Sequence, residues 1–208
     1  MDHLVWIDCE MTGRDASSDR ILEIACLVTD AELNVLDPGL DLVMSCKEEH
    51  LARMDDVVLT MHATSGLTEA VREATLTVEE AEKQVIDYIV GLVPDPKKAP
   101  LAGNSIGVDR GFLAHWMPTL DASLHYRMVD VSTVKELARR WYPRVYFQAP
   151  AKAGGHRALA DIQESVQELR YYRSAIFVQP PGPTSEQAQA LAQAVVQPTT
   201  GKPPPESR

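Results

Sequence analysis

An apolar run near the start of the chain ends in a closely spaced acidic pair, and this feature constrains the fold most. Leu4–Asp8 predicts a buried β-strand, and Glu10 follows Asp8 by two residues. Residues two apart on a strand point to the same face of a sheet. Two carboxylates held there repel each other, unless one takes up a proton or a cation such as Mg²⁺ or Mn²⁺ lies between them. The pair indicates a metal site, while two solvated acids at a strand end remain the simpler alternative.

The composition limits the class of protein and its partners. The chain has 208 residues, 45% of them hydrophobic and 24% charged, which suits one well-buried domain and a tail. We expect no signal peptide and no membrane partner, because no apolar stretch reaches the roughly 20 residues that span a bilayer. Three cysteines without metal-type spacing favour reduced thiols and a cytoplasmic protein. The net charge of −10 argues against a broad basic surface for long nucleic acids, but permits a small anionic substrate in one cleft.

Hydrophobic periodicity predicts strands in the first part of the chain, then helices that alternate with short strands. The predicted strands span 4–8, 21–30, about 35–45, a short stretch from 101, and 126–129. The predicted helices span 48–62, 67–74, 78–92, 107–116, 118–124, 131–142 and 156–174, with a capping box at Thr77 and Glu80 and a flexible loop over 143–155. This order indicates an α/β fold with a mixed sheet. We assign residues 1–178 to one domain and 179–208 to a tail rich in proline, alanine and glutamine, with room for one helix over 184–196.

Two further acids lie at the ends of predicted elements. Asp109 begins a helix after the Gly103–Gly107 turn, where an acid favours the helix dipole without any further role. Asp161 lies in the first turns of the last helix, and His156 lies at its entrance behind Gly154-Gly155. A fixed acid beside a movable histidine suits a metal ligand and a general base, although an ordinary helix acid and a loop histidine would look the same. Four carboxylates that converge on one cleft would match a two-metal phosphoryl-transfer site.

Three motifs resemble those of the DEDDh 3′→5′ exonucleases, namely Asp8-Cys-Glu10, Asn104-x4-Asp109 and His156-x4-Asp161. Four longer stretches are more specific and resemble the oligoribonucleases of that superfamily, in their actinobacterial form. These stretches are 6–13, 103–107, 125–127 and 130–141. The resemblance covers about residues 4–178 and leaves out the tail.

The resemblance implies a ribonuclease-H-like fold, with a five-stranded mixed sheet flanked by helices, and a homodimer. It implies a metal-dependent 3′→5′ exoribonuclease that hydrolyses very short oligoribonucleotides, notably dinucleotides, to 5′-mononucleotides. Two divalent ions, Mg²⁺ or Mn²⁺, would be held directly by Asp8, Glu10 and Asp161, with Asp109 acting partly through water. His156 would take the proton from the attacking water.

The resemblance also assigns residues to the substrate. The substrate-binding candidates are Ser105, Arg127, Ser132, His62, Asn104, Met11 and Arg14. Ser105, Arg127 and Ser132 match residues that hold the 5′ phosphate of a dinucleotide, so length selection needs no long basic track. Tyr126, grouped with His156 as catalytic, matches a tyrosine that crosses the dimer interface to stack on a base, with Arg127 acting across the same interface. As an alternative, Tyr126 and Arg127 would fit as plain strand and interface residues.

The base-stacking pocket is where the sequence departs from that family. Val57 stands where an aromatic residue, usually tryptophan, is common, and Arg14 stands where a leucine is common, while His62 is retained. Stacking on an aromatic ring is worth about 1–3 kcal/mol per base. Arg14 would compensate by stacking its guanidinium group.

Two other functions stay open at this point. The first is a DEDDh exonuclease that acts on longer RNA or DNA ends, against which the negative charge and the segment His125–Arg127 speak. The second is a catalytically silent nucleic-acid-binding module, in which one or more of the four acids would be expected to be lost.

Overall fold

The computed structural model describes residues 3–151 and 154–196 of the chain. The chain divides into two compact units, Met1–Ile176 and Phe177–Arg208. In the second unit, helix α10 spans Ser185–Val196, close to the predicted 184–196. In the described part of the chain, no helix is both long and apolar enough to cross a bilayer.

A five-stranded mixed sheet forms the centre of the first unit, as predicted. Its strands are β1 (Leu4–Met11), β2 (Ile21–Thr29), β3 (Leu40–Val43), β4 (Leu101–Gly103) and β5 (Met128–Asp130), in the order β3-β2-β1-β4-β5. β1, β2 and β3 pair antiparallel, whereas β4 runs parallel to β1 and β5 runs parallel to β4. The carboxyl ends of β1, β4 and β5 therefore meet at one edge of the sheet.

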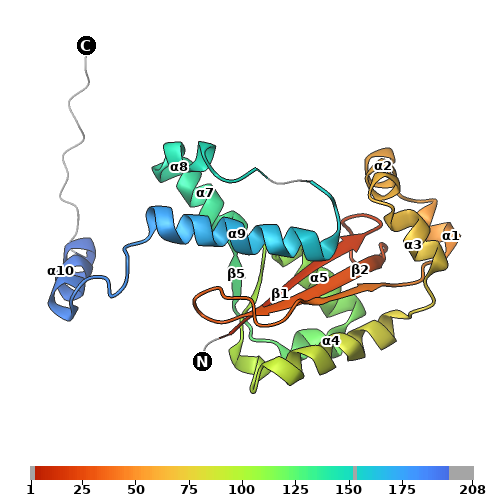
Figure 1. Cartoon of the computed structure of the whole chain (residues 1–208), viewed down its shortest axis with the longest axis horizontal. Coiled ribbons are helices and arrows are strands. Elements are labelled where there is room, and N and C mark those ends of the chain that lie inside the picture. Colours follow the sequence, from red (N-terminus) through yellow and green to blue (C-terminus); the bar gives the residue numbers. More distant parts are fainter. Residues whose placement is uncertain (1–2, 152–153, 197–208) are drawn as a thin grey trace, which may run out of the picture. The chain divides into compact units, whose positions relative to one another are not determined.

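The helices cover both faces of the sheet. They are α1 (Glu48–Leu51), α2 (Asp56–Thr64), α3 (Leu67–Glu73), α4 (Val78–Leu92), η1 (Pro96–Lys98), α5 (Gly107–Trp116), α6 (Pro118–Ser123), α7 (Val131–Trp141), α8 (Pro143–Phe147) and α9 (Ala158–Ile176). α4 lies across one face and α9 across the other, while α2 and α3 lie beyond the end toward which β1 runs (Figure 1).

Side-chain alternation along the central strands builds a core on each face. Val5, Ile7 and Cys9 are buried with α4 and α5, and Trp6 is buried with α9. Asp8 and Glu10 continue the series of Trp6, so both carboxylates leave β1 on the α9 side. The sheet thus presents the acidic pair to the helix that carries Asp161.

Local boundaries differ from the predicted ones in five places. β1 runs through Met11, so the acidic pair lies inside the strand, and β5 begins at Met128 rather than at residue 126. The single helix predicted over 48–62 is two helices, because Asp55 caps the start of α2 by accepting from Val58 N. The loop predicted over 143–155 contains α8, which begins at Pro143, a residue that suits the first helical turn. The last helix begins at Ala158, so His156 lies outside it.

Candidate active site

Three acids meet at the carboxyl end of β1. β4 pairs with β1 only at Val5 and Trp6, and beyond that point Cys9 N donates a hydrogen bond of 3.0 Å to Asp109 Oδ1. Asp109, in the first turn of α5, thus takes the place of a strand partner between Asp8 and Glu10. The three acids are brought together by a short β4 and by the helix that follows it.

The start of α9 completes the cluster. Glu10, His156 and Asp161 each place one potential ligand atom so that the three atoms lie within 4.8 Å of one another. Glu10 is buried, Asp161 is half-buried and His156 is exposed. His156 has a left-handed backbone, with φ at +47°, and follows Gly154, whose φ is +68°. The histidine therefore stands on a loop rather than on a helix.

The electrostatics of the cluster favour a cation. Burial, followed by the charges of Asp161, Glu23 and Asp109, raises the pKa of Glu10 to about 7. Burial raises the pKa of Asp109 to about 7, although its hydrogen bond from Cys9 acts in the opposite direction. The carboxylates hold their charge poorly without a compensating cation.

The donor set fits a divalent metal ion. Carboxylate oxygens are the preferred ligands of hard divalent cations, and a buried acidic cluster with raised pKa values is the environment that such an ion stabilises. Asp8, Glu10, Asp109 and Asp161 are the residues that would hold it, and their assignment as ligands stays a prediction. Asp8 has the strand position for that role.

His62 lies completely buried beside Glu10. Its Nε2 donates to Met11 O at 2.9 Å, and its Nδ1 lies 3.8 Å from Glu10 Oε2. Among the described residues, Nδ1 has no hydrogen-bond partner. Two of the predicted substrate residues, Met11 and His62, are thus joined to each other at the edge of the acidic cluster.

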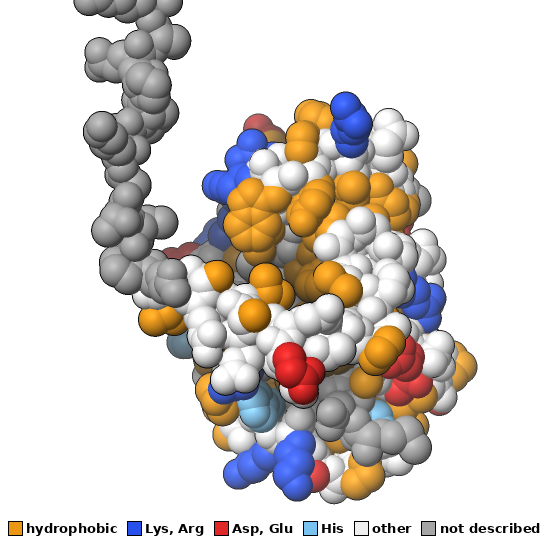
Figure 2. All heavy atoms as spheres, turned by 90° about the vertical axis from the view of Figure 1, so that its left-hand side faces the viewer, with side chains coloured by type: hydrophobic (Ala, Val, Ile, Leu, Met, Phe, Trp, Pro, Cys, Tyr) orange, Lys and Arg blue, Asp and Glu red, His pale blue; other side chains and the backbone are white. Residues whose placement is uncertain are grey.

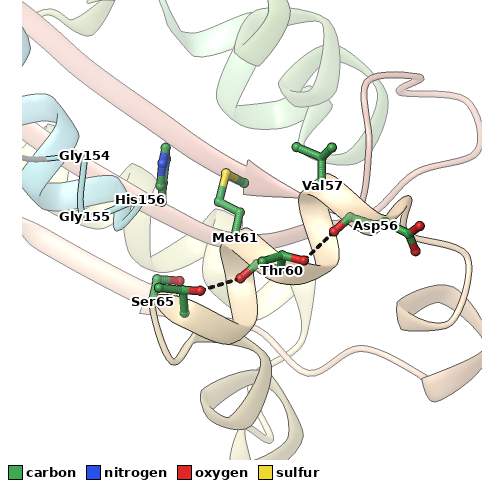
Figure 3. A pocket seen from close by; sticks show the side chains of 9 residues that line it. Asp56, Val57, Thr60, Met61, Ser65, Gly154, Gly155 and His156 are labelled. Carbon is green, nitrogen blue, oxygen red and sulfur yellow. Dashed lines mark hydrogen bonds between the residues drawn. The ribbon is translucent and has the colours of Figure 1, made fainter.

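A pocket of about 690 Å³ opens between α2 and the loop before α9. In Figure 3, Val57 and Met61 project from α2, and His156 lies with Gly154 and Gly155 on the segment across from that helix. Val57 is 77% exposed, so its isopropyl group offers little cover to a ligand. The pocket lies next to the acidic cluster because His156 belongs to both.

Ser105 and Ser132 come together at the ends of β4 and β5. Ser105 N donates to Asp130 Oδ1 at 3.0 Å and to Ser132 Oγ at 2.9 Å, and the two serine hydroxyls lie 3.1 Å apart. Ser132 Oγ donates to Asn104 Oδ1, and Asn104 Nδ2 donates to Ser165 Oγ at 2.7 Å. Asn104 therefore links the serine pair to α9, and its role as a substrate contact stays a prediction.

Tyr126 and Arg127 lie on an exposed loop before β5. Tyr126 is 72% exposed and stacks on His125, with 4.6 Å between ring centroids. The guanidinium group of Arg127 lies 5.3 Å from the Tyr126 ring centroid. Arg110 Nη1 donates to the carbonyl oxygens of His125 and Tyr126, which ties this loop to α5.

The sequence comparisons decide the family. A family model described as Exonuclease (RNase_T) matches residues 5–169. The chain is 57% identical to an oligoribonuclease of Nocardia farcinica over 91% of this chain and 88% of that protein. It is 58% identical to an oligoribonuclease of Streptomyces avermitilis over 92% of this chain and 95% of that protein. The chain belongs to the oligoribonucleases, within the exonuclease family.

Solved structures show the same fold at low identity. An exonuclease I from Methylocaldum szegediense matches with a TM-score of 0.65 and 19% identity, over 85% of this chain and 41% of that one. A zinc-bound complex of E. coli exonuclease I with single-stranded DNA matches with a TM-score of 0.68 and 13% identity, over 85% of this chain and 41% of that one. The present chain spans about two fifths of those chains, and the likeness establishes the ribonuclease-H-like fold alone.

Arg14, which was predicted to bind substrate, is not among the residues that line the pocket. It is exposed on the loop after β1, whereas the pocket is lined by α2 and by residues 154–156. Two charged groups that sequence reasoning missed lie inside the site instead, namely Glu23 on β2 and Arg157 beside His156. The available signal was Glu23 itself, a single acid within an otherwise apolar strand.

The α7–α8 surface carries exposed apolar side chains, among them Trp141, Tyr142 and Phe147. Figure 2, which looks at the side where α7 and α8 lie in Figure 1, shows hydrophobic groups beside Lys and Arg in its upper part. Arg139 and Arg140 on α7 both bind Glu136 of the same helix. These arginines are already paired, which makes them a poor basic track for RNA.

Proposed function

We propose that this protein is a metal-dependent 3′→5′ exoribonuclease that hydrolyses very short oligoribonucleotides, notably dinucleotides, to 5′-mononucleotides. The observation that carries the proposal is the convergence of Glu10, Asp161 and His156 within 4.8 Å beside a pocket. The curated relatives named oligoribonuclease support the choice of short RNA. The acidic surface agrees with a substrate held by its ends rather than along a basic track.

The proposed metal site holds two divalent ions, Mg²⁺ or Mn²⁺, between Asp8, Glu10, Asp109 and Asp161. Such ions, when bound, lower the pKa of a water molecule and offset charge on the reacting phosphate. His156 accepts the proton of the attacking water, and its exposed position at the pocket gives the ring access to that water. Its loop placement lets it close toward Glu10 when substrate is present.

The proposed limit on substrate length lies at the serine pair. Ser105 and Ser132 offer two hydroxyl groups, and Arg127 a guanidinium group, to the 5′ phosphate of a dinucleotide. Asn104 holds Ser132 in place through Oδ1. A chain with further nucleotides on its 5′ side would have to pass this cap.

The base is proposed to lie in the pocket between α2 and the loop of His156. Val57 and Met61 supply aliphatic surface in place of an aromatic ring. Met11 and His62 are proposed to support the base from behind, through their buried contact beside Glu10. Arg14, on the loop after β1, is proposed to add its guanidinium group to this base.

We further propose a cytoplasmic homodimer in which Tyr126 and Arg127 act on the substrate of the partner subunit. The exposure of Tyr126 and its stacking between His125 and Arg127 support this role, since a preformed aromatic group is ready to stack on a base. Sedimentation at micromolar concentration tests the dimer. A monomer with full dinucleotide activity would exclude any action of Tyr126 across an interface.

The function is tested by competing substrates of different length. Labelled dinucleotide and labelled 20-mer RNA are incubated separately with enzyme and Mg²⁺, and kcat/KM is compared. We expect the dinucleotide to be preferred and the Arg127→Ala variant to lose that preference selectively. Equal or faster loss of the 20-mer with the unchanged protein would favour an exonuclease for longer ends, and no hydrolysis of either would favour a silent binding module.

A further inference from the structure

A fifth carboxylate, Glu23, lies next to the acidic cluster. Glu23 on β2 is the direct partner of Glu10 across the β1–β2 ladder, so their side chains share the face toward α9. Its side chain is completely buried. A buried carboxylate needs a charged or hydrogen-bonding partner, and at this position it would otherwise compete with Glu10 for a cation.

That partner is the residue after the proposed base. Arg157 Nε lies 2.7 Å and Arg157 Nη2 2.6 Å from Glu23 Oε1. Asp41 on β3 lies 3.9 Å from Arg157 Nη2, so the guanidinium group bridges two strands. The Glu23 carboxylate therefore forms an ion pair with the Arg157 guanidinium group.

Glu23 also caps α9. The residues before this helix, Gly154-Gly155-His156-Arg157, include no Ser, Thr, Asp or Asn to accept from the first free N–H groups. Glu23 Oε2 fills that role from another strand by accepting from Ala158 N at 3.2 Å. An anion at a helix N-terminus is favourable as well.

The two contacts fix the point at which the movable loop ends. His156 immediately precedes Arg157 and has a left-handed backbone. Asp161 N donates a hydrogen bond of 3.0 Å to Arg157 O, which places Asp161 one turn further along the helix. The same short segment therefore sets the position of His156 on one side and of Asp161 on the other.

We propose that Glu23 and Arg157 are positioning residues, which hold His156 and Asp161 over Glu10 by clamping the start of α9 to β2. The proposal rests on the proposed function for its kinetic consequences only. The clamp touches no reacting group, although the charges of Glu23 and Arg157 both act on Glu10. Arg157→Lys keeps the positive charge and so separates that effect from the placement of His156.

The opposite end of α9 supplies a matched control. There Arg173 pairs with Glu32 on the turn after β2, again joining an arginine of α9 to a glutamate of the β2 region. The two arginine side chains are about equally exposed, 36% for Arg173 and 37% for Arg157, but Glu32 is exposed where Glu23 is buried. The control pair also lies far along the helix from the acidic cluster. If the clamp only fastened the helix, removing either arginine would affect turnover in the same way.

The experiment compares Arg157→Gln, Glu23→Gln and Arg157→Lys with Arg173→Gln. At a temperature well below every melting point, we expect Arg157→Gln to lower kcat on a dinucleotide by about tenfold to hundredfold, with KM changed by less than about threefold. Arg157→Lys should recover part of the loss, and Arg173→Gln should stay within about twofold of the unchanged protein. The double variant Glu23→Gln, Arg157→Gln should be no slower than Arg157→Gln alone, because both substitutions break the same ion pair between Glu23 and Arg157. Equal kcat in Arg157→Gln and Arg173→Gln would overturn the proposal.

Hydrogen exchange provides a second readout that needs no activity. Arg157→Gln should speed exchange at Ala158 N and in the first turn of α9 without speeding it around residue 173. Unchanged exchange at Ala158 would overturn the clamp even if the enzyme hydrolyses dinucleotides. If the unchanged protein were inactive on dinucleotides but the exchange result held, the proposed function would fail and the clamp would stand. A Glu23→Gln variant that does not fold leaves Arg157→Lys and Arg157→Gln to decide the question.

Discussion

The candidate active site joins two regions of opposite character. The acids of β1 and α5 lie on an internal strand and on the buried face of a helix, and Cys9 N donates a hydrogen bond directly to Asp109. His156 lies on an exposed loop between Gly154 and the clamped Arg157. One region is fixed by the sheet and the other by a hinge.

The difference separates two tasks. Metal ligands have to be held at fixed distances against their own repulsion, which a strand inside a sheet does well. A general base has to approach and leave substrate, which a short glycine-containing loop permits. We therefore expect changes at β1 to abolish the reaction and changes at the hinge to slow it.

The largest effect is expected at the rigid region. Glu10→Gln removes one charge from the cluster without changing its size, and we expect kcat to fall by about a thousandfold or more, as for the loss of several kcal/mol of stabilisation. The midpoint of the Mg²⁺ activation curve should rise in parallel. Titration of activity with Mg²⁺ measures both. Glu79→Gln, an exposed acid in the first turn of α4, is the matched control and should leave both quantities unchanged.

A smaller loss is expected at the hinge. His156→Ala should lower kcat by about a hundredfold, within the usual range for a general base, with Mg²⁺-induced thermal stabilisation intact. The histidine lies within reach of the acidic group, so the same variant also tests whether it is a ligand. Loss of the thermal shift would make His156 a ligand rather than the base. His115→Ala on α5 serves as control, because that ring is exposed and lies edge-on against Trp116, outside the acidic cluster.

The buried acids of β1 and α5 should also make the free energy of unfolding depend on pH. Glu10 binds its proton more tightly in the folded state, where its pKa is about 7 against 4.5 for the ordinary side chain. The contribution of Glu10 to the stability of the metal-free protein is therefore fully present below about pH 4.5 and is lost as pH rises through about 7, a change of about 3 kcal/mol. Asp109, with its pKa also raised to about 7, acts in the same direction.

Urea unfolding at a series of pH values, with a chelator present, measures how the free energy of unfolding of the metal-free protein changes with pH. Mg²⁺ should restore stability at pH 7.5 and do little at pH 4.5, because protonated carboxyl groups bind metal poorly. Glu10→Gln should lose its own part of the slope and keep that of Asp109. Metal-free stability that rises between pH 4.5 and 7 would contradict a buried acidic cluster.

Local sequence signals were sufficient for the framework of the site. The apolar run before Asp8 predicted β1, and the capping box of Thr77 and Glu80 at the start of α4 is confirmed, with both of its hydrogen bonds formed. Asp109 and Asp161 lie in the first turns of α5 and α9, as predicted. These features depend on residues a few positions apart, and helices and strands are encoded at that range.

The features that escaped prediction depend on contacts between distant segments. Glu23 and Arg157 are 134 residues apart, and Asn104 and Ser165 are 61 apart. No local pattern marks such a pair, because each member looks ordinary within its own element. The left-handed backbone of His156 is of the same kind, since histidine does not by itself require a positive φ.

The smallest effect is expected from a single methyl group at the hinge. Gly154 has a φ of +68°, whereas Gly155 does not lie in the left-handed region, and a Cβ at either position would meet nothing within 4 Å. An alanine in the left-handed region costs roughly 1–2 kcal/mol. Gly154→Ala should therefore lower kcat by about tenfold by displacing His156, with Mg²⁺ activation unchanged.

Gly155→Ala adds the same methyl group without the same strain and should stay within about twofold. Comparing the two variants separates the effect of backbone conformation from the effect of added side-chain volume, because both methyl groups would project into open space. Equal losses in the two variants would show that chain flexibility, rather than the left-handed turn, places the base. No loss in either would mean that substrate binding overrides the hinge, and the contrast between the fixed acids and the movable histidine would then rest on His156 alone.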